Sequence, residues 1–577
     1  MYKKIIGAVV GLTTLVVAVT GCTSGQLNQK VQQDKTYDKF ITVDVFDDYS
    51  NYQGLQTGWF AQIVKDKFNM ELNIIAPNVA GGGNTTYQTR AAAGDLGDLV
   101  ILSTDNGRLT ESISAGLVME ASDLMEGKDI LTNYSEAVES ANASLDGIYA
   151  FPSAVSSGSP TESQEGLEPT FGPYIRWDYY KALGYPELKD LDDLLDVLED
   201  MQALARQTEG TDDIYALSFF SDWDDNMMNN AKQIACMYGY DEVGFMLLSA
   251  DGSSRQSILD EDSLYIKALR FFYEAQKRGL VDPDSSVQNY STWTDKYTTG
   301  KTLFCPWPWV CQNVFNTQDN ISQKKGYMLA PVEDMQIYSY GNNPEGDTSL
   351  VICVGANAQD PQRMADFIDW LYSPEGIRLN GQTAGSAGIE GLTWEINEEG
   401  KPELTDYGKS ALPDNNVEVP EEYGGGSWKD GGSKLNFKSV NVQDTDPKTG
   451  EAYNWKSWET TLADDENSLF ADWQDHMGAS SSMEYLRAND MITVSAGTAY
   501  SIPASTADIT TIRKQCKSAI VSASWNMIFA ESDEDFEEQL AQMKQTAYAL
   551  GFDQVLEVDN QNANDFDEAR QQAIAGE

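Results

Sequence analysis

Beyond residue 36, short runs of alternating apolar and polar residues take turns with longer runs of helical spacing. The segment "FITVDVF" (40–46) alternates as a strand does, and "LQTGWFAQIVKDKF" (55–68) places apolar residues three and four positions apart. "ELNII" (71–75) is a second strand, and "TTYQTRAAAGDLGDLVIL" (85–102) passes from a helix into a third strand at 99–102. Strands that alternate with helices predict an α/β fold with a parallel sheet.

The loops that follow these strands carry polar side chains. Asp47 and Asp48 come directly after the first strand, and Asp105 and Asn106 follow the third. Ligands of open α/β sheets bind in the crevice beyond the carboxyl ends of the strands. We therefore predict that these four side chains are ligand-binding.

The first 36 residues have a different pattern. Two lysines precede an apolar run, Ile5–Val19, which is typical of a secretory signal peptide. Its length of about 15 residues falls short of the ~20 that a membrane-spanning helix needs. "VTGC" (19–22) resembles a bacterial lipobox. We predict a lipoprotein signal peptide at 1–21, a palmitate-type lipid anchor on Cys22, a flexible tether at 22–36, and an exported protein held at the outer face of the bacterial cytoplasmic membrane. The alternative is an ordinary signal peptide with a chance cysteine.

Charge and composition narrow the classes of partner. The chain has 577 residues, with 90 acidic and 39 basic side chains and a formal charge of −51, a balance that repels nucleic acid. With 41% hydrophobic residues it can bury a large core in at least two domains. No cysteine pair has the spacing of a zinc site, and His476 is the single histidine, so we expect no metal and no cofactor. Cys305 and Cys311 are expected to be either buried thiols or a disulfide.

Several segments, in order along nearly the whole chain, resemble the extracellular solute-binding proteins of ABC importers. The family is family 1, the carbohydrate-binding type, in its long lipoprotein branch. The segments that carry the resemblance are "AAAGDLGDLVIL" (91–102), "SAGLVMEASDLM" (114–125), "LDGIYAFPS" (145–153), "YIRWDYYKALGYPELKDLDDLLDVLEDM" (174–201), "YIKALRFFYEAQKRGLVDPDS" (265–285), "YTTGKTLFCPWPW" (297–309), "GYMLAPVEDM" (326–335), "ANAQDPQRMADFIDWLYSPEG" (356–376), "AGIEGLTWEINEEGKPELTDYG" (387–408) and the tail 522–558.

The resemblance implies a two-lobe α/β fold of the periplasmic-binding-protein type, with discontinuous lobes joined by a hinge. It implies lobe one at 37–151 and 300–352 and lobe two at 152–299 and 353–577, with crossings near 148–152, 298–310 and 350–355. It also implies a monomer that captures a carbohydrate between the lobes and delivers it to the transmembrane subunits of an ABC permease. The expected carbohydrate is an oligosaccharide.

Tryptophans in loops suggest where a sugar would bind. A neutral sugar stacks its C–H faces on aromatic rings and pairs its hydroxyls with carboxylates or amides. Trp223 lies beside Asp222 in "SDWDDN", Trp307 and Trp309 lie in "CPWPWV", and Trp428 lies in a glycine-rich loop. If "CPWPWV" is extended, Trp307 and Trp309 point the same way. We predict that these five residues bind solute; the alternative for each tryptophan is core filling.

Two other functions remain open at this stage. One is a lipoprotein that binds peptides or cationic solutes, which the acidic balance favours mildly. The other is a lipid-anchored glycoside hydrolase with two catalytic carboxylates, although carboxylate pairs arise by chance in so acidic a chain. A serine-histidine-aspartate triad would have to use His476, and no nucleophile-elbow motif is present. We therefore expect a binding protein without catalytic residues.

Overall fold

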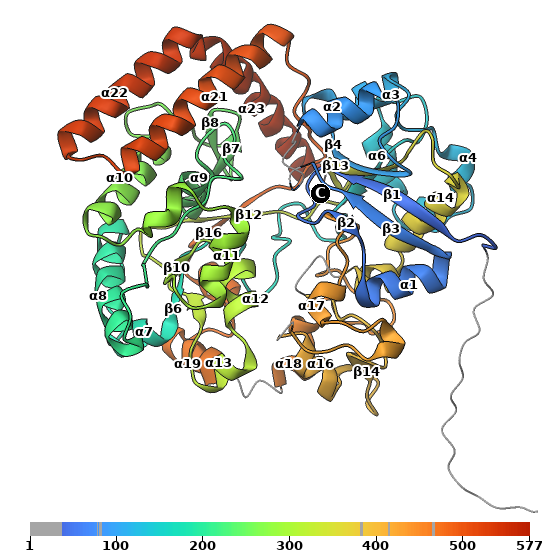
Figure 1. Ribbon diagram of the computed structural model, residues 1–577, viewed down its shortest axis with the longest axis horizontal. Coiled ribbons are helices and arrows are strands. Elements are labelled where there is room, and N and C mark those ends of the chain that lie inside the picture. The colour runs from blue at the N-terminus through green and yellow to red at the C-terminus, as the bar shows by residue number, and fades with distance from the viewer. Residues whose placement is uncertain are drawn as a thin grey trace, which may run out of the picture.

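The computed structural model describes residues 37–576, apart from 78, 80–83, 381–384, 414–415 and 464–467. The predicted signal peptide, Cys22 and the predicted tether lie outside the described residues. The described chain forms two lobes side by side, with lobe one on the right of Figure 1 and lobe two on the left.

Lobe one is built on a mixed sheet with the strand order β2-β3-β1-β4-β13-β5. β1 runs parallel to β3 and β4, as the alternation of strands and helices predicts. β13 comes from a distant part of the chain and pairs antiparallel with β4 and β5. The bounds are β1 (Ile41–Asp47), β2 (Gly54–Leu55), β3 (Met70–Ile75), β4 (Leu99–Ser103), β5 (Phe151–Ser153) and β13 (Asp347–Val354).

Side chains alternate between the two faces of this sheet. Val43 and Val45 of β1 pack in the larger core of lobe one, whereas Phe46 packs in a smaller core on the opposite face. Helices cover both faces of this mixed sheet, whose central strands β3, β1 and β4 are parallel. They are α1 (Gly58–Phe68), α2 (Asn84–Ala92), α3 (Arg108–Ser114), α4 (Ser122–Met125), α5 (Ile130–Asn133), α6 (Ser135–Asn142), α14 (Pro361–Leu371) and α15 (Pro374–Leu379).

An annex of short elements, residues 385–463, extends lobe one beneath its sheet in Figure 1. Trp394 and Trp458 are fully buried in a small core of its own. Its elements are β14 (Trp394–Ile396), β15 (Pro402–Leu404), α16 (Asp406–Ala411), α17 (Trp428–Gly431), the 3-10 turn η4 (Trp455–Ser457) and α18 (Glu459–Ala463).

In lobe two, small sheets and many helices surround one large hydrophobic core. Its strands are β6 (Tyr174–Arg176), β7 (Tyr240–Val243), β8 (Met246–Ser249), β9 (Arg255–Ser257), β10 (Phe304–Cys305), β11 (Tyr327–Leu329), β12 (Ile337–Tyr340) and β16 (Ile492–Ser495). Its helices are α7 (Trp177–Ala182), α8 (Leu191–Glu209), α9 (Asn229–Met237), α10 (Leu264–Lys277), α11 (Tyr290–Thr298), α12 (Pro308–Phe315), α13 (Gln318–Ser322), α19 (Ser468–Met477), α20 (Ser482–Ala488), α21 (Ala507–Ile528), α22 (Asp533–Leu550) and α23 (Phe552–Ala575).

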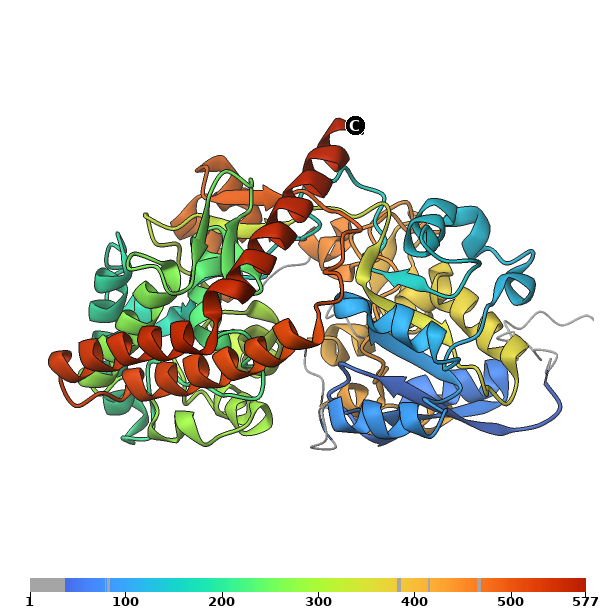
Figure 2. The same cartoon turned by 90° about the horizontal axis from the view of Figure 1, so that it is seen from above.

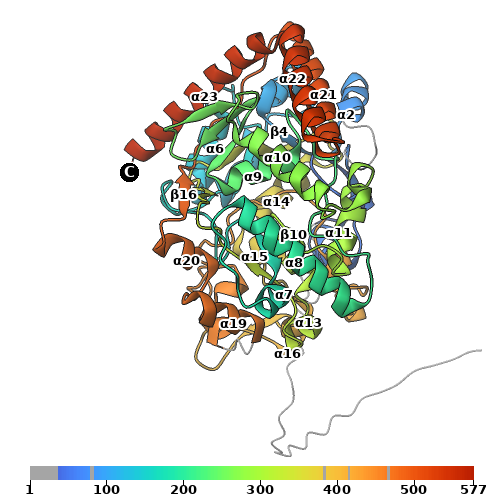
Figure 3. The same ribbon diagram turned by 90° about the vertical axis from the view of Figure 1, so that its left-hand side faces the viewer.

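The long helices of lobe two have clear start and stop signals. The Asp190 carboxylate accepts hydrogen bonds from two backbone N–H groups in the first turn of α8, and Gly210 ends that helix in the left-handed conformation. α8 and α10 lie on the outer face seen in Figure 3. Seen from above, α21 and α22 run antiparallel along lobe two, and α23 returns toward the gap between the lobes (Figure 2).

The observed cores divide the chain at different positions from those that the resemblance implies. Side chains from Leu303 to Tyr338, predicted in lobe one, pack in the core of lobe two. Side chains from Val354 to Tyr453, predicted in lobe two, pack in the core of lobe one. The physical reason is β13, which joins the sheet of lobe one and carries the following hundred or so residues with it. The cores fit lobe one at 37–155 and 347–463, and lobe two at 171–340 and 468–576.

The chain crosses between the lobes at 156–170 and at 341–346. The first of these lies later along the chain than the crossing predicted near 148–152. Here three segments lie backbone to backbone: the Gly341 N–H donates to the Ser495 carbonyl (2.8 Å), and the Gly497 N–H donates to the Pro160 carbonyl (3.1 Å). A Cβ on Gly341 would lie 2.0 Å from the Pro160 oxygen, and one on Gly497 would lie 1.8 Å from the Asn342 oxygen. Only glycine allows this close approach.

Candidate functional site: a cavity between the lobes

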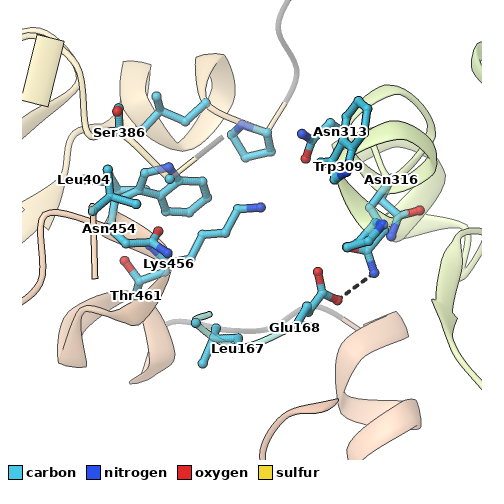
Figure 4. A pocket seen from close by; sticks show the side chains of 18 of the residues that line it. Leu167, Glu168, Trp309, Asn313, Asn316, Ser386, Leu404, Asn454, Lys456 and Thr461 are labelled. Carbon is cyan, nitrogen blue, oxygen red and sulfur yellow. Dashed lines mark hydrogen bonds between the residues drawn. The ribbon is translucent and has the colours of Figure 1, made fainter. Parts of the chain in front are cut away.

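A cavity of about 1320 Å³ lies between the annex of lobe one and helices α12 and α13 of lobe two. Crossing residues 164–170 and segment 438–443 form another part of its wall. Figure 4 shows Trp309, Asn313 and Asn316 on one side, with Ser386, Asn454 and Lys456 on the other. Both lobes therefore contribute side chains to one partly open cavity.

The wall from lobe two presents one tryptophan, Trp309, whereas the predicted site residues Asp222 and Trp223 are not among the described residues that line the cavity. Trp309 lies in the first turn of α12 and its side chain is 40% exposed. The Trp223 ring lies beside it, with centroids 6.2 Å apart and planes 25° apart, and is itself stacked on Tyr290 at 4.5 Å. Asp222 accepts a hydrogen bond from the Tyr290 N–H (2.9 Å), so it positions that supporting ring. Amide side chains of α12, including Asn313, line the cavity next to Trp309.

The segment with Trp307 and Trp309 is not extended as expected, and the two tryptophans differ in burial although their ring centroids lie 5.4 Å apart. The strand ends at Cys305, and α12 begins at Pro308, whose fixed φ suits the first position of a helix. Trp307 is only 4% exposed, and its Nε1–H donates to the Gln233 Oε1 (3.1 Å). It fills the core, while Trp309 faces the cavity. Cys305 and Cys311 are buried free thiols.

The wall from lobe one contains Trp428, Trp455 and Lys456. Trp428 lines the cavity but is only 7% exposed, because its ring stacks on Trp59 (4.5 Å, 12°) and its carbonyl accepts the Trp59 Nε1–H (2.9 Å). Trp455 is 8% exposed, and its Nε1–H has no hydrogen-bond acceptor among the described residues. Lys456 extends into the cavity between the two walls (Figure 4).

Two glutamates of the crossing segment face the cavity, and burial raises the pKa of both. The Glu165 carboxylate accepts hydrogen bonds from the Ser339 hydroxyl (2.6 Å) and the Thr170 N–H (2.7 Å). The Glu168 carboxylate accepts one from Gln312 Nε2 (2.6 Å), and the positive charge of Lys456 partly offsets the effect of burial on its pKa. Conversely, burial lowers the pKa of Lys456, and Glu168 opposes that shift.

The aspartates predicted from the strand ends lie elsewhere. Asp47, Asp48, Asp105 and Asn106 sit at the carboxyl ends of β1 and β4 as expected, but none is among the described residues that line the cavity. Other segments cover them: Asp47 accepts a hydrogen bond from the Asn436 N–H (2.7 Å), and Asp105 accepts one from the Ile502 N–H (2.8 Å).

This burial has an electrostatic consequence. It raises the pKa of Asp47 to about 7 and that of Asp105 to about 6. The Asp48 carboxylate is paired with Arg108 at 3.2 Å. These groups hold together the top of lobe one, and the solute-binding role predicted for them has no support from the cavity.

The sequence analysis did not single out Lys456, Glu168 or the amides of α12. A signal for Lys456 was present, because a lysine between two tryptophans in "YNWKSW" combines a charge with aromatic surface. Glu168 and α12 had no such signal, since their meeting depends on the lobe arrangement.

Among the described residues no cluster of three or more His, Cys, Asp or Glu is placed to hold a metal ion. No helix within the described ranges is long and apolar enough to span a membrane.

Comparison with known proteins identifies the architecture. Residues 59–388 match the family described as bacterial extracellular solute-binding protein. The alginate-binding protein AlgQ2, solved without calcium ion, is similar at 14% identity, covering 92% of this chain and 99% of that one, with a TM-score of 0.59. The Streptococcus pneumoniae ABC-transporter substrate binding protein FusA, in complex with kestose, is similar at 17% identity, covering 93% and 100%, with a TM-score of 0.56. No curated protein sequence matches the chain.

Proposed function

The chain belongs to the bacterial extracellular solute-binding proteins, and on that premise we propose that it is the substrate-binding lipoprotein of an ABC importer that captures an oligosaccharide between its lobes. Membership of this family makes it an exported binding protein. We further propose that Cys22 carries the lipid that holds it at the outer face of the cytoplasmic membrane, and that it works as a monomer which delivers its solute to the permease.

The observation that carries the carbohydrate proposal is the Trp309 ring, which is exposed in the wall of a cavity lined by both lobes. The C–H face of a pyranose ring is apolar and flat, so it stacks well on an indole. The Asn313 amide beside the ring offers both donors and an acceptor to sugar hydroxyls. The cavity is larger than the pockets of about 300–1,000 Å³ that hold one drug-sized ligand, so its size suits several sugar rings rather than one.

The named ligands of the similar structures agree with this proposal. FusA was solved with kestose, and AlgQ2 is an alginate-binding protein. Both share the two-lobe fold over more than nine-tenths of this chain. They support an oligosaccharide as the solute of this chain, without specifying which sugar.

The mechanism follows from a cavity shared by two lobes. A solute that touches both walls stabilises the closed arrangement by its differential affinity for closed over open, and so shifts the population toward it. Trp309 and Asn313 would hold the solute from lobe two, and Asn454 and Trp455 from lobe one. The closed form would then be the one that the permease recognises.

The test is calorimetric titration of the mature protein with a panel of neutral and acidic oligosaccharides, with peptides of similar size as controls. Binding of an oligosaccharide with no new product in the mixture supports the proposal. Binding of peptides alone would favour the peptide-binding alternative. Release of shorter sugars would favour a glycoside hydrolase that uses Glu165 and Glu168, two of the three glutamates among the described residues of the cavity wall.

A further inference from the structure

Basic side chains outnumber acidic ones among the described residues of the cavity wall, whereas acidic ones outnumber basic ones over the whole chain. Over the whole sequence, acidic side chains outnumber basic ones by 90 to 39. Among the described residues that line the cavity, four lysines meet three glutamates and no aspartate. These residues are Lys409, Lys429, Lys438, Lys456, Glu165, Glu168 and Glu403. The described lining therefore carries a formal charge of +1 in a chain of −51, so an anion meets less repulsion here than over the rest of the surface.

Lys456 is the clearest part of this feature. It is half-buried, and its Nζ forms no hydrogen bond or ion pair with any residue that the structure describes. Its Nζ lies 5.9 Å from the centre of the Trp455 ring. Taking a charge out of water costs free energy unless a partner compensates for it. The protein has many carboxylates, yet none of the described ones pairs with the Lys456 ammonium. An anionic ligand could supply this missing partner.

A second, independent group points to the same place. The Nε1–H of Trp455 is a hydrogen-bond donor without an acceptor in the described chain, and its side chain is more than nine-tenths buried in the cavity wall. Buried donors are nearly always satisfied. The Lys456 Nζ lies 5.9 Å from the centre of the Trp455 ring, so the two donors border the same part of the cavity wall.

Lys438 adds to this on the adjoining wall. It is half-buried, lines the cavity, and forms no side-chain hydrogen bond or ion pair with the described residues. Burial lowers its pKa, which shows that the nearby charges of Asp444, Asp347 and Glu165 do not fully compensate for lost solvation.

We propose that the captured oligosaccharide carries a carboxylate, and that Lys456 and the Trp455 indole N–H bind this carboxylate with Lys438 nearby. This inference rests on the proposed function and names its substrate class, an acidic carbohydrate such as a hexuronate or a sialylated sugar. Trp309 stacks against a sugar ring on the opposite wall, so the ligand is held by its face from lobe two and by its charge from lobe one.

Glu168 offers a competing explanation, because it is the described acid whose charge acts on Lys456. In that case the two side chains approach each other when the lobes close, and the lysine serves closure rather than the solute. The carboxylate of Glu168 already accepts a hydrogen bond from Gln312 within lobe two. The two explanations predict opposite effects of the Glu168→Gln substitution.

The experiment compares acidic oligosaccharides with neutral counterparts of equal length. One arm uses a hexuronate tetrasaccharide and its carboxyl-reduced form, and a second uses a sialyl-terminated oligosaccharide and its desialylated form. Titration of the wild type should give at least about tenfold tighter binding of the acidic member in one arm, the range of a hydrogen bond to a charged group. The arm that responds identifies the source of the carboxylate.

Lys456→Gln should weaken binding of the acidic member by about tenfold or more and change that of the neutral one less than about threefold. Glu168→Gln should strengthen binding of the acidic member. Lys514→Gln, an exposed lysine of α21 that does not line the cavity, removes one charge as a matched control and should change neither.

The proposal is overturned if the neutral member binds as tightly as the acidic one, or if Lys456→Gln and Glu168→Gln weaken both members equally. If no oligosaccharide of either kind binds, the proposed function itself fails, which is a different result. The comparison within the wild type needs no variant, so a folding defect in Lys456→Gln leaves the test decisive.

Discussion

Replacing Trp309 by alanine should separate binding from stability. The ring sits in the first turn of α12 with 40% of its surface exposed to the cavity, and Trp223 flanks it. Its removal takes away a stacking surface but leaves the core of lobe two in place. Trp307, two residues earlier, is the natural comparison because it is the same residue type and is only 4% exposed.

The magnitude follows from the exposed surface. A tryptophan buries roughly 250 Å² when fully covered, so the exposed part of Trp309 corresponds to roughly 100 Å². If a sugar covers between half and all of it, the contact contributes about 1.3 to 2.5 kcal/mol at ~25 cal/mol per Å². The dissociation constant should then rise by about 10- to 70-fold in Trp309→Ala. Trp307→Ala should instead cost about 3 to 5 kcal/mol in the free energy of unfolding, as large core truncations do.

The assay measures both quantities on both variants: calorimetric affinity for the tightest oligosaccharide of the panel, and denaturant unfolding of the free protein. We expect Trp309→Ala to unfold within about 1 kcal/mol of the wild type, as surface substitutions do. Trp307→Phe, which keeps an aromatic ring in the core, serves as the milder control. An unchanged affinity in Trp309→Ala would refute the assignment of this ring to the solute.

Three further predictions concern the anchor, closure and pH. Cys22→Ala should move the protein from the membrane fraction to the medium with its circular dichroism spectrum unchanged; retention on membranes would contradict a lipid anchor. A saturating oligosaccharide should reduce the radius of gyration in small-angle scattering, and an identical profile with confirmed binding would mean that the lobes do not close. Burial raises the pKa of the native Asp47 carboxyl to about 7, whereas the unfolded carboxyl loses its proton near pH 3.8. This difference should make the free energy of unfolding fall as pH rises from about 4 to about 7, by about 4 kcal/mol at most. Asp47→Asn should flatten this fall in thermal unfolding between pH 4 and 8, and an equal slope in the variant would exclude Asp47 as its source.

The local pattern predicts individual elements well. The strand expected at 40–46 is β1 at Ile41–Asp47, and the one expected at 99–102 is β4 at Leu99–Ser103. These elements depend on alternation and helical spacing within a few residues, which the sequence states directly. The lobe boundaries depend instead on β13, whose partners β4 and β5 lie some two hundred or more residues earlier in the chain. Pairing over that distance has no local signature.

The candidate site shows the same limit. Trp309 and Trp428 line the cavity, and the clue was a tryptophan in a proline- or glycine-rich loop. Asp47 and Asp105 occupy the strand ends where ligands of α/β sheets usually bind, yet segments from residues 436 and 502 cover them. The general rule for α/β sheets placed them correctly in the fold. It could not account for an annex that helps to form a cavity away from the strand ends.

The crossing between the lobes is tightly packed, and this packing has a consequence for how the lobes move. At Gly341 and Gly497 the main chains of three segments touch with no side chain between them. A methyl group at either position would force these segments apart. If the lobes close by rotating about this crossing, a small displacement here becomes a larger one at α12 and the annex. A substitution that never meets the solute can therefore change how long the solute is held.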